Sequence, residues 1–194
     1  GLDRLVDFGS MFCTWNYTGG RGVGHTLQRQ AIPMVWDYPE ANPLNPEASG
    51  WITACEKNEK WIEHASLASH YPAIVGQYSA TKLPFPDEYF DAILTDPPYY
   101  DNVNYAELSD FFYVWLKQTV GHLYPELFST PLVPKDKEIV ANPVRQGNAL
   151  RAKEFFEENL AKAFKEINRA LKPKGIAVIV YAHKSTWGWE SLIN

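Results

Sequence analysis

Residues Asp91 to Tyr100 read DAILTDPPYY, and this decisive stretch carries the strongest structural signal of the sequence. Its first half is an apolar run of strand type, and its second half brings an acidic residue, two prolines and two aromatic residues to one place. Pro97 and Pro98 lack a backbone N–H and have a fixed φ, so neither can extend a sheet ladder. The chain is therefore predicted to leave a sheet at Asp96 on a stiff turn. A turn with a carboxylate, free carbonyl groups and aromatic rings suits a planar ligand that bears an amino group.

Composition bounds the classes of protein to which this stretch can belong. The chain has 194 residues, 45% of them hydrophobic, which suits one globular domain with a core. Cys13 and Cys55 are far apart, which argues against a disulfide framework or a zinc ribbon and favours a reducing, cytoplasmic setting. No apolar run approaches the roughly 18 residues of a membrane span, so no membrane partner is expected. The net charge of −5 makes this chain alone a poor clamp for nucleic acid.

Upstream of the decisive stretch, the pattern predicts a second strand of the same sheet. Ala73–Tyr78 reads as a strand, and residues 79–88 read as a loop that leads into the strand ending at Asp96. In doubly wound sheets, ligands bind at the carboxyl ends of parallel strands. We therefore expect Ser79, Ala80 and Asp96 to lie at one edge of the sheet and to form one wall of a pocket.

Downstream, the pattern predicts a helix, a long connection, a second helix and a strand. Apolar residues repeat at threes and fours over 105–119 and 149–171, which indicates two helices with buried faces rather than a base-stacking platform. The connection 121–147 is either a solvated loop or a segment that orders around substrate. Its possible phosphate contacts are Lys135, Lys137 and Arg145. Residues 176–182 form an almost continuous β-branched run, typical of a buried parallel strand.

Two basic residues, His183 and Lys184, follow this last predicted strand. They are expected beside the Asp96 turn if the two strands are neighbours, because parallel strands end at the same edge of a sheet. At that place His183 either contacts a substrate or is held by structural hydrogen bonds, and the pattern leaves both interpretations open.

The N-terminal region, residues 1–70, is predicted to be irregular and helical. We interpret its glycine cluster, Gly19–Gly24, as a plain loop in preference to a cofactor loop, because the dinucleotide fingerprint needs a preceding strand and a following helix. A helix is predicted from Trp51 to Ser69. His64 and His70 are six residues apart, which is not the spacing that places two ligands on one helical face, so no metal site is expected.

The residues around the decisive stretch resemble those of a known family. LPFPDEYFDAILTDPPYY, from Leu83 to Tyr100, looks like the third-to-fourth motif region of amino-directed DNA methyltransferases that use S-adenosylmethionine. Their D-P-P-Y signature corresponds here to residues 96–99. Further stretches resemble the large prokaryotic adenine-specific DNA methylases that carry a zinc ribbon elsewhere, namely RQA at 29–31, MVWDY at 34–38, EANP at 40–43, LSDFFYVWLK at 108–117 and YAHK at 181–184.

This resemblance implies a fold, an activity and a set of site residues. The fold would be a partial doubly wound, Rossmann-like methyltransferase domain of class α/β, with a mostly parallel sheet and flanking helices. The activity would be methyl transfer from S-adenosylmethionine to the exocyclic amine of adenine in DNA. The expected catalytic residues are Asp96, Pro97, Pro98 and Tyr99. The expected cofactor-binding residues are Ser79, Ala80 and Asp96, and the expected substrate-binding residues are Tyr100, His183 and Lys184.

The chemistry read directly from the residues agrees with this implication. The amine of adenine is a poor nucleophile because its lone pair is delocalised into the ring, so an enzyme gains by accepting its N–H protons. The Asp96 carboxylate and the Pro97 carbonyl are acceptors of the right kind. The base must first leave the duplex stack, and Tyr99 offers a face on which the flipped ring can rest. No covalent intermediate or metal is needed.

The chain also departs from the family pattern. It lacks a convincing F-x-G-x-G cofactor motif, which we expect upstream of Gly1, and the family would continue beyond Asn194. Residues 71–194 are therefore expected to be an incomplete catalytic domain whose partners are DNA and the remaining part of the parent methyltransferase. Two other interpretations stay open: methylation of another planar amine, such as cytosine, an RNA base or a glutamine side chain, and a non-catalytic nucleic-acid-binding module.

These expectations lead to a first testable outcome. A chain without the glycine-rich cradle should bind S-adenosylmethionine weakly or not at all, and calorimetric titration measures this directly. Micromolar binding would show that the cofactor loop lies within these residues after all.

Overall fold

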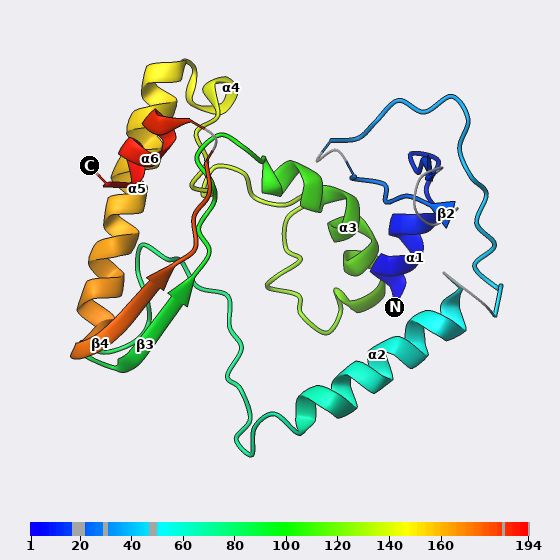
Figure 1. The fold of residues 1–194 in the computed structure, drawn as a ribbon, viewed down its shortest axis with the longest axis horizontal. Helices are drawn as coiled ribbons and strands as arrows, with labels where there is room; N and C mark the ends of the chain where they lie inside the picture. The colour runs from blue at the N-terminus through cyan, green and yellow to red at the C-terminus, as the bar shows by residue number, and fades with distance from the viewer. Residues whose placement is uncertain (17–21, 29–30, 47–49, 184, 194) are drawn as a thin grey trace. The chain divides into compact units, whose positions relative to one another are not determined.

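A computed structural model describes residues 1–16, 22–28, 31–46, 50–183 and 185–193 of the chain (Figure 1). The chain forms two compact units, each discontinuous in sequence. The first comprises Gly1–Ala73 and Tyr105–Pro134, and the second comprises Ile74–Asn104 and Lys135–Asn194. Residues 71–194 were predicted to form one incomplete catalytic domain. Tyr105–Pro134 instead packs with the N-terminal region. Among the described residues, no helix has the length and apolar character needed to cross a membrane.

The second unit is built on two parallel strands, β3 (Phe90–Thr95) and β4 (Leu171–Ile179). Ala92 lies opposite Ile176 and Thr95 lies opposite Ile179, so the carboxyl ends of the two strands coincide. The predicted strand before Asp96 and the predicted strand of β-branched residues are thus confirmed, and so is their pairing as neighbours. A mixed α/β architecture with a small parallel sheet follows.

Two helices accompany this sheet, α5 (Ala149–Ala170) and α6 (Thr186–Ile193), and a short one, α4 (Pro143–Gln146), precedes them. α5 begins at Asn148, whose side chain accepts a hydrogen bond from the Arg151 backbone N–H and so caps the first turn. The predicted apolar stripe of α5 is confirmed, because Phe156 and Leu160 are buried. The core of the unit contains Tyr100, Ala141, Ala152, Phe156 and Leu160.

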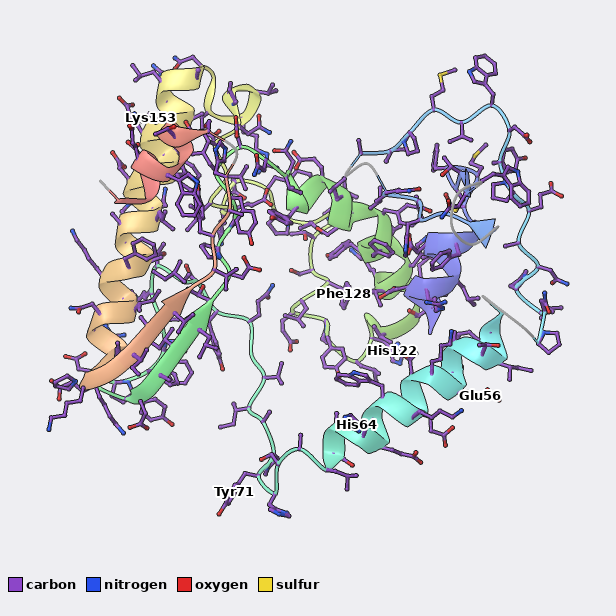
Figure 2. The ribbon with its side chains drawn as sticks, in the orientation of Figure 1. Glu56, His64, Tyr71, His122, Phe128 and Lys153 are labelled. Carbon is purple, nitrogen blue, oxygen red and sulfur yellow. The ribbon has the colours of Figure 1, made fainter. Side chains whose placement is uncertain are left out.

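The first unit contains α1 (Leu2–Gly9), α2 (Trp51–Ser66), α3 (Tyr105–Val120) and a short antiparallel pair, β1 (Trp15–Asn16) with β2 (Gly22–Val23). Both α2 and α3 contact α1. The predicted helices over 51–69 and 105–119 are confirmed as α2 and α3. Side chains along α2 such as Glu56 and His64 are exposed (Figure 2).

The structure corrects two sequence predictions in the second unit. Ala73–Tyr78 is not a strand: it has no ladder partner among the described residues, and Ile74 and Val75 are 88% and 92% exposed. An apolar run becomes a strand only when a neighbour supplies hydrogen bonds, and this run finds none. The second correction concerns the strand predicted over 176–182, which instead spans Leu171–Ile179, so that the segment KPKG at 172–175 belongs to β4. A register shift between Phe90 and Ala92 accommodates it.

The parallel sheet is small and incompletely covered. Leu94 is 76% exposed and Ile176 is 66% exposed, although parallel strands normally bury both faces. With two strands, each strand also keeps one edge without a ladder partner among the described residues. The structure therefore shows a mixed α/β unit with a two-stranded parallel sheet, and the Rossmann-like arrangement stays a prediction.

Arg169, near the end of α5, ties the loop before β3 to that helix. Its guanidinium donates to the backbone carbonyls of Leu83 at 3.2 Å and Phe85 at 2.9 Å, and to the Asp87 carboxylate at 2.7 Å. Glu166 completes the arrangement by accepting from Arg169 at 2.9 Å and from the Leu83 backbone N–H at 2.8 Å. The hydrogen bond from Arg169 and then the one from Leu83 lower the pKa of Glu166 from its ordinary 4.5 to about 2.

This low pKa predicts a pH dependence of stability. Because the folded state holds Glu166 ionised, its contribution is complete above about pH 4.5 and is lost as the pH falls towards about 2. Glu166→Gln keeps an acceptor but does not titrate, so its stability should fall less than that of the wild type over this range. Urea unfolding of both proteins tests this. The midpoints are measured from about pH 6 to about pH 2, so that the series spans both pKa values of Glu166. Parallel curves for the two proteins would contradict it.

Candidate functional site

The candidate site lies where β3 and β4 end together. The Thr95 carbonyl accepts from the Val180 backbone N–H at 2.9 Å, which carries the pairing one step beyond the strands. After Thr95 the prolines break the ladder, as predicted from their missing donors. Residues 96–100 from one strand and 181–183 from the other thus leave the sheet side by side.

Asp96 and Pro97 present acceptors at this edge. Asp96 is exposed and Pro97 is half-buried. Among the described residues, none donates a hydrogen bond to the Asp96 carboxylate or to the Pro97 carbonyl. The next carbonyl, that of Pro98, accepts from the Tyr100 backbone N–H at 3.1 Å and closes the turn. The turn therefore offers two oxygen acceptors, held on a backbone that two successive prolines stiffen.

Tyr99 lies in a small aromatic cluster that the sequence analysis did not anticipate. Its ring is half-buried and meets the Tyr181 ring at 5.5 Å in an edge-on arrangement, and Tyr181 in turn meets Trp189 at 5.3 Å. The Tyr181 hydroxyl donates to the Gly188 carbonyl at 3.1 Å. Burial, and then the Asp101 and Tyr100 groups, raise the pKa of Tyr181, so this phenol stays protonated at neutral pH. The cluster can stack and orient a ring but does not supply a base.

Tyr100 lies in the core, although it was predicted to contact substrate. Its side chain is 4% exposed and packs edge-on against Phe156, with ring centroids 5.0 Å apart. Its φ is +53°, in the left-handed region that non-glycine residues rarely adopt. Burial raises the pKa of its hydroxyl, with the Asp101 and Glu157 carboxylates adding to the effect. The structure therefore gives Tyr100 an anchoring position, and substrate contact by it stays a prediction.

His183 lies beside the turn, as the sequence predicted, but faces protein groups. Its side chain is 2% exposed, and its Nε2 atom lies 3.3 Å from the Asp101 carboxylate. Of the two open interpretations, these contacts favour the structural one. Lys184, the other basic residue predicted here, lies outside the described residues.

Ser79 and Ala80 are not brought to the Asp96 edge by any described contact. Ser79 forms an isolated bridge with Lys82, and its hydroxyl lies 2.9 Å from that of Thr81. The loop that follows is fixed by Arg169 at the opposite end of the sheet, where β3 and β4 begin. The common pocket wall was predicted from a strand at 73–78 that does not form, so cofactor binding by these residues stays a prediction.

The predicted phosphate contacts differ in their surroundings. Arg145 donates to Glu138 at 2.6 Å and to the Lys135 carbonyl at 3.0 Å, and both side chains of the ion pair are largely buried. Its charge is therefore already balanced by a neighbour. For Lys135 and Lys137 a phosphate contact stays a prediction.

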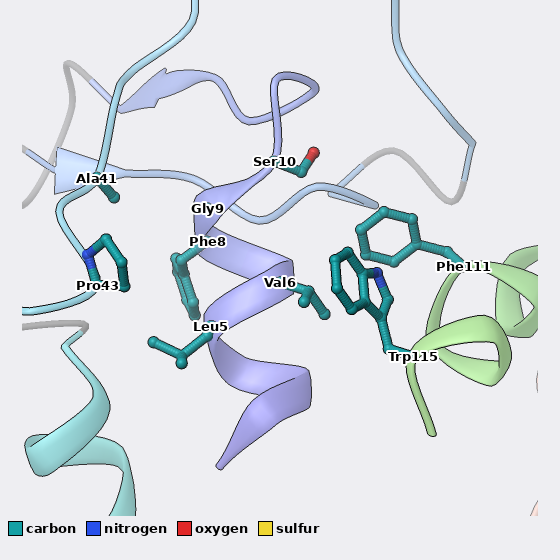
Figure 3. Close-up of a pocket in the computed structure, with 9 residues that line it drawn as sticks. All are labelled: Leu5, Val6, Phe8, Gly9, Ser10, Ala41, Pro43, Phe111 and Trp115. Carbon is teal, nitrogen blue, oxygen red and sulfur yellow. The ribbon is translucent and has the colours of Figure 1, made fainter. Parts of the chain in front are cut away.

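A separate apolar cavity of about 240 Å³ lies within the first unit, between α1, α3 and the segment around Pro43 (Figure 3). Its lining residues are Leu5, Val6, Phe8, Gly9, Ser10, Ala41, Pro43, Phe111 and Trp115. The polar side-chain groups of its lining are the Ser10 hydroxyl, which accepts from the Phe12 backbone N–H, and the indole N–H of Trp115. This cavity can pack an apolar group, and its lining residues include no ionisable acid or base.

Two other groups of residues bear on cofactors. Within the described residues, no cluster of three or more His, Cys, Asp or Glu side chains has the geometry of a metal site. Gly22 and Val23 from the glycine cluster form β2, which pairs antiparallel with β1 and does not open a helix. Gly19, Gly20 and Arg21 lie outside the described residues. Gly22 and Val23, from the described part of this cluster, thus belong to a short antiparallel strand pair.

Comparisons with known proteins give no neighbour for this arrangement. No protein-family model, no curated protein and no solved structure matches the chain.

Because Tyr99 and Tyr100 differ in burial, we expect their replacement by alanine to lower the free energy of unfolding by different amounts. Tyr100→Ala removes a buried ring against Phe156, so we expect a loss of about 3–5 kcal/mol in the free energy of unfolding. Tyr99→Ala is the matched control, and its half-buried ring should cost clearly less. Urea unfolding of both variants measures the difference. Equal losses would contradict the anchoring position of Tyr100.

Proposed function

We propose that this chain is the substrate-side part of an S-adenosylmethionine-dependent DNA methyltransferase that acts on the exocyclic amine of adenine. The observation that carries the proposal is the pair of open acceptors, the Asp96 carboxylate and the Pro97 carbonyl, at the carboxyl end of a parallel strand. Ligands of open α/β sheets bind at such ends. The chemistry of an amine with two N–H donors fits two adjacent oxygen acceptors.

The proposed roles follow from the surroundings of each residue. The Asp96 carboxylate and the Pro97 carbonyl accept hydrogen bonds from the two N–H groups of a flipped adenine, which makes the nitrogen lone pair more available for attack. Tyr99 supports the base with its ring, Tyr181 packs edge-on against Tyr99, and Trp189 packs against Tyr181. Pro98 fixes the turn, so the acceptors lose little freedom when the base arrives.

The described residues at this edge do not fit S-adenosylmethionine. A methyl donor of this kind needs a backbone cradle for its adenosine and amino-acid parts, and among the described residues the Asp96 edge shows no glycine-rich turn. Ser79 and Ala80 precede a loop that is fixed at the other end of the sheet.

The cradle is proposed to come from another segment of the same enzyme, as additional strands of the sheet. Two observations support this part of the proposal: β3 and β4 each have one edge without a ladder partner among the described residues, and the Leu94 and Ile176 side chains are exposed. A cytoplasmic location belongs to it as well, because both cysteines are free thiols, as in reducing compartments.

The proposal is tested by removing the charge of Asp96 in the full-length protein that contains these residues. Asp96→Asn should lower methyl transfer to DNA by about 10²–10³-fold, the usual cost of losing a group aimed at developing charge. Asp91→Asn is the matched control: Asp91 is an exposed carboxylate near the start of β3, paired with Lys172 at 2.7 Å, and its loss should leave activity unchanged. Activity that survives Asp96→Asn would reject the catalytic proposal and favour a non-catalytic module.

A further inference from the structure

The His183 ring is held on several sides by groups of the same unit. Its side chain is 2% exposed, with the Tyr100 ring edge-on at 5.9 Å between centroids. Gly188 of α6 lies so close that a Cβ at this position would collide with the ring. The His183 backbone carbonyl also accepts from the Trp189 indole N–H at 2.9 Å. A ring enclosed in this way offers almost no surface to a ligand, so its effect must pass through the residues that it touches.

The hydrogen bonds around the ring decide which nitrogen carries the proton. Nε2 lies 3.3 Å from the Asp101 carboxylate, which can only accept, so Nε2 carries a proton and donates it to Asp101. On the other side of the ring, Nδ1 lies 3.1 Å from the Ser185 backbone nitrogen, 3.0 Å from the Ser185 hydroxyl and 3.3 Å from the Ser185 carbonyl oxygen. The contacts with Ser185 hold the ring in the orientation that points Nε2 at Asp101.

Asp101 belongs to the turn that carries the proposed acceptors. It follows Tyr100, whose φ of +53° has an energetic cost that the surroundings must offset. On the other side, the Tyr100 carbonyl accepts from the Ala141 backbone N–H at 3.0 Å. The turn is thus tied to the segment before α4 by Tyr100 and to the end of β4 by the Asp101–His183 contact.

We propose that His183 is a positioning residue, whose Nε2–H holds Asp101 and thereby fixes the turn that presents Asp96 and the Pro97 carbonyl. The inference rests on the proposed function for its effect on catalysis, but its effect on the turn is independent of any activity. His183 itself does not touch the substrate. Gly188 takes part because only a residue without a side chain leaves room for the ring at this place.

The test uses variants of the full-length protein that separate the two ring nitrogens. His183→Asn keeps an acceptor near Nδ1 but cannot reach Asp101, whereas His183→Gln extends a donor towards Asp101. We expect His183→Asn to lower kcat for methyl transfer by about ten- to a hundredfold with KM for DNA little changed, because a misplaced reacting group costs about this much. His183→Gln should recover part of the loss.

Three further variants leave the histidine unchanged. Asp101→Ala should reproduce the loss in kcat and should add nothing in combination with His183→Asn, because both remove the same contact. Asp101→Asn keeps an acceptor for Nε2–H and should stay close to wild type. Gly188→Ala, which displaces the ring but leaves both polar groups in place, should lower kcat as His183→Asn does.

Amide hydrogen exchange of residues 99–102 supplies a readout that needs no activity. Faster exchange in Asp101→Ala and His183→Asn, with unchanged exchange in α5, is the expected result. Additive losses in the double variant, wild-type kcat in Asp101→Ala, or unchanged exchange would overturn the positioning role. If the wild-type protein transfers no methyl group to DNA, the proposed function fails, while the exchange measurement still decides whether His183 orders the turn.

Discussion

The hydrogen bond from the Val180 N–H to the Thr95 carbonyl extends the parallel pairing of β3 and β4 to their common edge, and the candidate site depends on that pairing. Because the strands are in register, the chain leaves the sheet at the same level in both strands, at Asp96 after β3 and at Val180 after β4. Pro97 and Pro98 then prevent any further pairing. The chain must turn at this place, and its acceptors remain open to a ligand. Without the register, neither the aromatic cluster nor the contact between Asp101 and His183 would form.

The turn is held by packing as well as by hydrogen bonds. Tyr100 adopts a left-handed backbone conformation, which costs on the order of 1–3 kcal/mol. Its ring is buried against Phe156, and burying an aromatic side chain of this size offsets such a cost. The adjacent Tyr99 keeps part of its ring at the surface. Of these two consecutive tyrosines, Tyr100 therefore anchors the turn in the core, and Tyr99 lies at the candidate site.

The sequence predicted the elements of this unit more fully than their partners. The apolar run before Asp96, the stripe of α5 and the β-branched run in β4 each follow a local period, so each could be recognised without the structure. Ala73–Tyr78 has the same strand-like composition but remains unpaired, because a strand depends on a neighbour that local pattern does not reveal. The roles of Tyr100 and His183 depend on burial, which comes from contacts distant in sequence. Asp101 directly follows the decisive stretch, which ends at Tyr100. This proximity is the one feature of the sequence that could have placed Asp101 at the site.

The most direct test of the central claim is the identity of the methylated product. The full-length protein is incubated with DNA and S-adenosylmethionine that carries a labelled methyl group, and the digested nucleosides are separated and analysed by mass spectrometry. The proposal predicts the label on the exocyclic nitrogen of adenine, whose amine has the two N–H groups that the two acceptors at the Asp96 turn can bind. Label on the exocyclic nitrogen of cytosine would keep the role of the acceptors but reject adenine as the substrate, and label on a ring carbon of cytosine, or DNA without label, would contradict the proposal altogether.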